Sequence, residues 1–255
     1  MRRITLSMIL LALVITIVGC SPKGDPKETL EAYYANIINE DYKAAYAMLL
    51  ESDKQATTRD EFVQFMELNE QLTKLKKVEV KQAEKNGDTV VFDVIENGHD
   101  AIENKDKAAT VKRSVTVENG EWKVAAEGPY KNMIADRMAW IGNMYLNGTG
   151  GKTLNLDTAV TWFEDALEQD PSYYRANYGL AAALTKLQLY EEAITYAQKY
   201  VDASKDNKEK SSGLNILGIC YDVTGEREKA KEAFQKAVEL NPENKSAQNN
   251  LNQFK

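Results

Sequence analysis

One stretch near the C-terminus, residues 214–242, limits the possible folds of the chain more than any other. Small residues, aromatic residues and a proline stand there at fixed offsets among bulky apolar side chains. The residues that define the pattern are Leu214, Leu217, Gly218, Tyr221, Gly225, Ala230, Phe234, Ala237 and Pro242. The spacing predicts two antiparallel helices, because small residues permit a close approach, glycine permits the turn and proline ends the second helix. One such hairpin cannot bury its own apolar face, so neighbouring hairpins are expected.

Two upstream segments repeat the same offsets. Residues 178–203 supply Leu180, Ala181, Leu184, Tyr190, Ala193 and Ala197, and residues 140–171 supply Gly142, Tyr145, Ala159, Phe163, Ala166 and Pro171. The pattern resembles the 34-residue tetratricopeptide repeat (TPR). The first unit has five extra residues between its helices, and with Gly148, Gly150, Asp157 and Trp162 it resembles the related Sel-type repeat.

The resemblance implies an all-α superhelix over residues 130–255, with three repeats at about 133–171, 172–206 and 208–242 and a capping helix at 243–255. In relatives, the first helices of the hairpins line a concave face that binds an extended peptide or a helix. The groove-facing offsets fall on Asn143, Arg175, Tyr178, Asn215 and Asp222. Arg175 lacks the companion lysines of chaperone-tail binders, so a ligand with a C-terminal carboxylate is not implied. For each of these residues, an ordinary solvated helix face is the alternative.

Residues 26–128 have a different pattern. Apolar residues at helical spacing predict helices over 27–38 and from Tyr42 to about Leu50, and a third after Thr58, whose N-cap position is followed by Glu61 in a capping-box arrangement. Alternating runs then surround two Asn-Gly pairs, at 86–87 and 119–120. Because type I′ turns need positive φ at both central positions, Asn-Gly favours a hairpin. The expected domain is α+β, with three helices packed on about four antiparallel strands.

This order of elements resembles the domains similar to nuclear transport factor 2, which form a curved-sheet cone. The phrases that match are residues 29–49, residues 57–66 and the final strand around "ENGEWKV". Enzymatic relatives place an Asp or a His in the pocket as a general base. The single histidine, His99, is expected in a polar connection between strands, and Asp93 is expected at an exposed strand position. The sequence contains no HExxH or paired CxxC metal motif, so no metal and no cofactor are implied.

The first 20 residues carry a targeting signal. Arg2 and Arg3 precede an almost uncharged apolar run over 4–18, which is short for a helix that spans a bilayer. The run ends in Ile-Val-Gly-Cys, which resembles the bacterial lipobox. The resemblance implies removal of residues 1–19, a diacylglycerol on the sulfur of Cys20 and a tether over 20–26. An ordinary signal peptide or a short membrane anchor is the alternative.

Charge and cysteine content narrow the possible partners. The chain has 32 basic and 39 acidic residues, a net charge of −7. Loss of residues 1–19 removes two arginines, so 30 basic residues against 39 acidic ones leave −9. Such a surface disfavours nucleic acid. Beyond Cys20 only Cys220 remains, so no internal disulfide is possible, and we expect Cys220 to be a small buried apolar residue.

Two functions follow as hypotheses. The first is a non-enzymatic, lipid-anchored interaction or scaffold protein outside the bacterial cytoplasm, which binds a protein or peptide of the cell envelope through the concave face. The alternative is a small-ligand-binding or enzymatic cone domain with accessory repeats, which a deep pocket with polar groups converging around Asp93 would favour. Self-association through the repeats is a third possibility, which the acidic surface neither requires nor forbids.

Overall fold

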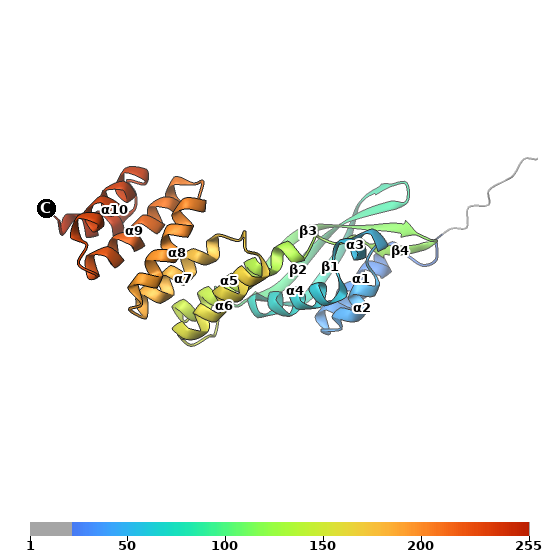
Figure 1. Cartoon of the computed structure of the whole chain (residues 1–255). Helices are drawn as coiled ribbons and strands as arrows, with labels where there is room; N and C mark the ends of the chain where they lie inside the picture. The colour runs from blue at the N-terminus through green and yellow to red at the C-terminus, as the bar shows by residue number, and fades with distance from the viewer. Residues whose placement is uncertain (1–21, 255) are drawn as a thin grey trace, which may run out of the picture.

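The computed structural model describes residues 22–254, apart from the side chains at positions 82 and 83. Figure 1 shows an elongated molecule, with an α+β region (residues 22–124) at one end and a row of helices that extends away from it. We call the second part, residues 131–254, the helical region. Within the described residues, no helix combines the length and apolar character needed to cross a bilayer. Cys20 and the apolar run before it lie outside the described residues.

Four helices and four strands form the α+β region. The helices are α1 (Pro26–Ile38), α2 (Tyr42–Ala47), α3 (Glu51–Ala56) and α4 (Arg59–Leu72), and the strands are β1 (Thr73–Asn86), β2 (Thr89–Asp100), β3 (Lys105–Glu118) and β4 (Glu121–Val124). The predicted capping box is present, because the Thr58 hydroxyl accepts from the Glu61 backbone and the Glu61 carboxylate accepts from the Thr58 backbone. This arrangement satisfies two of the backbone donors that a helix start leaves unpaired.

The prediction of three helices was wrong, because α3 is an additional helix and α2 ends before it. No side chain of α3 is buried, so the segment carries no apolar periodicity that a sequence reading could detect. Its position is fixed by a distant contact instead. The Asp53 carboxylate accepts a hydrogen bond of 2.8 Å from the backbone N–H of Ala126, in the connection that follows β4.

The sheet is antiparallel in the order β1-β2-β3-β4. At the second hairpin, Asn119 and Gly120 have φ values of 53° and 79°, the positive pair that a type I′ turn requires. The first hairpin differs from the expectation, because its two-residue loop is 87–88 and only Gly87 has positive φ. Two register shifts interrupt β1 opposite β2, and such bulges bend a strand.

Helices α1 and α4 pack on one face of this sheet, and the core lies between the two layers. Val90, Phe92 and Val94 alternate along β2 and are fully or almost fully buried against that layer. The alternation of buried and partly exposed residues gives β2 one inner and one outer face. Inner-face residues of β2 and β3 therefore point toward the helices.

Seven helices form the helical region. They are α5 (Lys131–Asn147), α6 (Leu156–Gln169), α7 (Arg175–Lys186), α8 (Tyr190–Ala203), α9 (Asn207–Val223), α10 (Arg227–Leu240) and α11 (Lys245–Asn252). Helices α5 and α6, α7 and α8, and α9 and α10 are neighbours, and each hairpin contacts the next. Gly142 and Gly179 both face the buried ring of Phe163, and an added Cβ would collide with the ring at Gly179 and would touch it tightly at Gly142. Small residues thus permit close packing within and between hairpins.

The two regions are joined without a free linker. Tyr130, directly before α5, has no exposed surface, and its ring lies 5.1 Å from that of Phe62 and 4.8 Å from that of Phe65. Arg137 of α5 donates to the Asn69 side chain of α4 at 3.0 Å. Helix α5 is therefore packed both on α4 and on the hairpins that follow it.

Candidate functional site

Helices α5, α7 and α9 carry all five residues predicted to face a groove. Helix α7 contacts both α5 and α9, so the three helices lie in a row. Tyr178 is 36% exposed and the Arg175 side chain is 59% exposed, whereas Asn143, Asn215 and Asp222 are half-buried. The row therefore presents partly exposed side chains from each of the three helices.

Arg175 is held by the neighbouring hairpin. Its guanidinium forms an ion pair of 2.9 Å with Glu209 of α9, and the hydroxyl of Tyr174 donates to the same carboxylate at 2.8 Å. The hydrogen bond to Glu209 also raises the pKa of the Tyr174 hydroxyl above its ordinary value. Because Arg175 is exposed, this ion pair contributes little stability, and a partner with a carboxylate can compete for the guanidinium.

Besides Arg175, three more of the five residues have polar partners within the chain. Asn143 donates to the Ala139 carbonyl of its own helix at 3.0 Å. Asn215 accepts from the Asn250 amide of α11 at 2.9 Å, so the final helix reaches the predicted groove. Asp222 lies 3.8 Å from Arg227. These contacts reduce the hydrogen-bonding capacity that the three side chains offer to a partner.

Two aromatic side chains, Tyr178 and Trp140, are exposed on these first helices, as is Val223 at the end of α9. Tyr178 packs one side of its ring against Tyr200 of α8, with ring centroids 5.1 Å apart. Trp140 of α5, which the sequence analysis did not identify, is 46% exposed and lies on the same side of its helix as Asn143, three residues on. The sequence signal that could have identified Trp140 is a bulky aromatic residue three positions before the predicted groove residue Asn143. Partly exposed aromatics are the usual anchors of protein interfaces.

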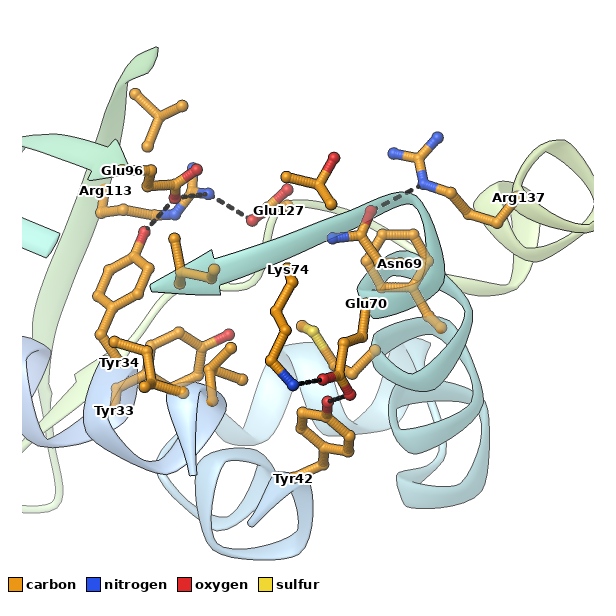
Figure 2. A pocket seen from close by; sticks show the side chains of 17 residues that line it. Tyr33, Tyr34, Tyr42, Asn69, Glu70, Lys74, Glu96, Arg113, Glu127 and Arg137 are labelled. Carbon is orange, nitrogen blue, oxygen red and sulfur yellow. Dashed lines mark hydrogen bonds and ion pairs between the residues drawn. The ribbon is translucent and has the colours of Figure 1, made fainter. Parts of the chain in front are cut away.

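The α+β region contains a pocket of about 330 Å³ between its sheet and its helices. Its apolar lining comes mainly from α1 and α4, and its polar lining includes six charged side chains from α4, from strands β1, β2 and β3, from the segment after β4 and from α5. The charged residues are Glu70, Lys74, Glu96, Arg113, Glu127 and Arg137. Figure 2 shows Glu96, Arg113 and Glu127 gathered on one side of the pocket and Tyr42, Glu70 and Lys74 on another.

Arg113 is the most buried of these charges, with only 13% of its side chain exposed. It projects from the inner face of β3, where it is paired with Phe92 of β2. Its guanidinium contacts Glu96 at 3.1 Å and also Glu127, and the Tyr34 hydroxyl donates to Glu96 at 2.7 Å. Burial lowers the pKa of Arg113, but the carboxylates of Glu127 and Glu96 outweigh burial and hold that pKa above its usual value.

The second polar group of the pocket is centred on Glu70 of α4. Glu70 accepts from Lys74 at 2.7 Å and from the Tyr42 hydroxyl at 2.9 Å, and Lys74 also lies 3.3 Å from Glu40. The hydrogen bond from Lys74 lowers the pKa of Glu70. The first polar group joins two carboxylates to the Arg113 guanidinium, and the second joins two carboxylates to the Lys74 ammonium group.

Neither candidate base from the sequence reaches the pocket. Asp93 lies on the outer face of β2 and forms an exposed ion pair of 2.8 Å with Lys112. His99 was expected in a connection, but it lies within β2, because β2 and β3 extend to the chain reversal at 101–104 and their polar ends pair. Its Nδ1 lies 2.9 Å from Asp106 of β3, at the surface. Polar groups thus converge in a pocket, as the alternative hypothesis required, but not around Asp93.

Cys220 is fully buried, and burial raises the pKa of its thiol, as expected for a small packed side chain. Among the residues that the structure describes, no cluster of His, Cys, Asp and Glu has the arrangement of a metal site. The charged pocket residues were missed from the sequence, although Glu96 and Arg113 have the parity of the buried residues Val94 and Val115. A charge at an inward position on two paired strands was the available signal.

Comparisons with known proteins concern the helical region. Among solved structures, the chain is similar to the Arabidopsis OM64 TPR domain (19% identity, 49% of this chain and 97% of that chain, TM-score 0.44). It is also similar to the second TPR domain of human RPAP3, solved with an HSP70 peptide (23%, 48% and 96%, 0.42), and to MamA of Desulfovibrio magneticus RS-1 (28%, 48% and 68%, 0.39). No curated protein matches the chain. Tetratricopeptide family models match residues 152–208 and 211–244, so the helical region contains tetratricopeptide repeats.

Proposed function

We propose that the chain is a non-enzymatic protein-interaction module, which binds a segment of another protein along the first helices α5, α7 and α9. The tetratricopeptide match supports an array that presents these helices side by side. The observation that carries the proposal is the exposure of two large aromatic side chains, Trp140 and Tyr178, on that row. Exposed aromatics provide large contact areas with few rotatable bonds.

Three tetratricopeptide repeats and a cap complete this proposal. We take the repeats as the hairpins at about 133–171, 172–206 and 208–242, with α11 as the cap. The three hairpins and the packing of the final helix support this division, since Phe254 lies 5.7 Å from Phe234 of α10 and Asn250 bonds to Asn215. We also interpret residues 26–128 as a cone-type domain similar to nuclear transport factor 2, on the basis of helices packed on one face of an antiparallel sheet.

Lipid attachment at Cys20 and a position outside the bacterial cytoplasm are further parts of the proposal. They rest on the sequence of residues 1–20. A diacylglycerol group provides two chains, and two acyl chains hold a protein at a bilayer far more firmly than one. Residues 20–26 would then form the tether, and the interaction surface would lie beyond the α+β region, away from the membrane.

The surface is tested by crosslinking from defined positions. A photoreactive phenylalanine analogue at position 178 is compared with the same analogue at position 235, where Gln235 is exposed on the second helix α10. We expect a crosslinked adduct of defined mass from position 178 and none from position 235. Loss of this adduct in the Trp140→Ala variant supports the aromatic row. The same adducts from both positions would contradict a partner bound along the first helices.

The anchor is tested separately. In a bacterial host, metabolic labelling with a fatty acid is expected to mark the wild-type chain and to leave the Cys20→Ala variant unlabelled. The Cys220→Ala variant is the matched control, because Cys220 is buried and should not affect labelling. Equal labelling of wild type and Cys20→Ala would exclude lipidation at this cysteine and leave the interaction surface as a separate question.

A further inference from the structure

The cations that line the pocket of the α+β region are already bound by carboxylates. Three cationic side chains line it, and each is already ion-paired: Lys74 with Glu70 and Glu40, Arg113 with Glu96 and Glu127, and Arg137 with Asp136. Three carboxylates, Glu70, Glu96 and Glu127, line the pocket together with these three cations, so the charges of the lining balance, and Glu40 and Asp136 lie outside the lining. Partial burial keeps water from screening such charges fully.

Within this lining, negative charge is in local excess at the Arg113 cluster. One guanidinium lies between two carboxylates, and both contact the same Nη2 atom. The cluster carries one net negative charge on side chains that are between 13% and 37% exposed. An incoming anion would have to displace a carboxylate that Arg113 already binds, whereas an incoming cation would meet carboxylates with spare acceptor capacity.

Aromatic rings surround these carboxylates. Tyr33, Tyr34 and Tyr42 line the pocket beside the two polar groups, as Figure 2 shows. The ring of Phe65, also in the lining, is already covered by a cation, because the Arg137 guanidinium lies 5.4 Å from its centroid. The negative face of an aromatic ring attracts cations, and this attraction is stronger where water is excluded.

We propose that this pocket binds a small organic cation, an ammonium group attached to an apolar body. The ammonium group lies against Glu96 and Glu127, and the apolar body contacts the tyrosine rings and the aliphatic side chains Ile37 and Leu75. The volume of about 330 Å³ lies within the range of small-molecule sites. The lining shares helix α5 with the protein-binding row through Arg137, but it does not include Trp140 or Tyr178.

Three probes of similar shape and different charge test the proposal on the full-length chain. The probes are phenethylamine, the neutral 2-phenylethanol and the anion phenylacetate, each titrated by calorimetry. We expect phenethylamine to bind about tenfold more tightly than either analogue, and to bind more weakly as salt is added. Phenylacetate that binds as tightly as the amine, or no binding of the amine at millimolar concentration, would overturn the proposal.

Substitutions locate the site. Glu127→Gln removes one carboxylate charge of the cluster and is expected to raise the dissociation constant of phenethylamine about tenfold. Glu164→Gln, on the exposed side of α6, changes the net charge equally and should leave binding unchanged. In wild type, nuclear Overhauser effects between the probe ring and tyrosine ring protons provide a measurement that needs no variant. Equal weakening by both substitutions, or the absence of tyrosine contacts, would exclude this pocket.

Discussion

In the α+β region charged side chains point into the fold, whereas the helical region packs small and apolar residues inside and places its ion pairs at the surface. Arg113 enters the α+β core between two carboxylates. Phe163 enters the helical core between two glycines. The difference follows from geometry, because a sheet and the helices packed on it can enclose a pocket, while stacked hairpins with alanine and glycine contacts leave little internal space.

The contrast also separates two ways of binding. The pocket can surround a small ligand and favours one of complementary charge. The row of first helices instead offers an open surface with exposed aromatic side chains. Each way of binding depends on a different kind of residue. Substitutions in each region can therefore test this contrast through their effects on the free energy of unfolding.

The largest effect is expected from Phe163→Ala. Phe163 is 1% exposed and fills the space beside Gly142 and Gly179, so its removal leaves a cavity where backbones lie close together. We expect a loss of about 3–5 kcal/mol in the free energy of unfolding, measured by urea denaturation followed by circular dichroism. Leu154→Ala, at a position that is 59% exposed, should change stability by less than about 0.5 kcal/mol. A loss below about 1 kcal/mol for Phe163→Ala would mean that the hairpins can collapse around the gap.

Arg113→Met tests the inward charges. The substitution leaves Glu96 and Glu127 close together without their shared cation, and we expect a loss of about 2–3 kcal/mol in the same assay. Lys112→Met is the matched control on the adjacent residue, which faces outward and pairs with the exposed Asp93. It should cost less than about 0.5 kcal/mol. Similar losses for both variants would remove the distinction between the two faces of the sheet.

Alkaline pH tests the buried tyrosine at the junction of the two regions. Burial raises the pKa of Tyr130 from 10.0 to about 12. Below about pH 10 the hydroxyl is protonated in both states, so its contribution to stability is fully present. Between about pH 10 and pH 12 the unfolded chain releases this proton and the folded chain retains it, so stability falls as pH rises.

The loss attributable to Tyr130 at about pH 11.5 is expected to be about 2 kcal/mol relative to about pH 9. It is measured as the difference between the urea midpoints of wild type and Tyr130→Phe at the two pH values. The variant should lose less stability than wild type on the shift to alkaline pH. Identical losses would show that Tyr130 ionises equally in both states.

The smallest effect is expected at the start of α4. Thr58→Ala removes the side-chain half of the capping box, with an expected loss of about 1 kcal/mol. Thr58→Ser keeps the hydroxyl and should retain most of the stability. If the loss of stability also appears in the unfolding of the helical region, the two regions unfold together, because α4 is the helix on which α5 packs. A loss confined to the α+β signal would show that the two regions unfold separately.

Local patterns predicted much of this fold. The Thr58 capping box, the two hairpins and the paired helices all depend on residues that are near one another in the sequence. Helix α3 could not be predicted in this way, because its place depends on a contact between Asp53 and Ala126. The prediction that His99 lies in a connection was wrong, because pairing of the strands around His99 and Asp106 extends the hairpin beyond its apolar residues.

The sites were less accessible to sequence reasoning. Tyr178 was predicted and is exposed, but the engagement of Asn215 by Asn250 depends on how the final helix packs. The cluster around Arg113 joins residues from β2, β3 and the segment after β4 with Tyr34 of α1. Alternation along a strand can indicate that a charge points inward, but it does not indicate which other charges meet it there.

The six-residue connection at 125–130 joins β4 to α5, and its last residue, Tyr130, is wedged under α4. A connection packed in this way does not act as a flexible hinge. A force applied near α11 would be transmitted through α5 and α4 to the sheet, because no flexible linker lies between them. The orientation of the α+β region therefore determines the direction in which helices α7 to α11 face.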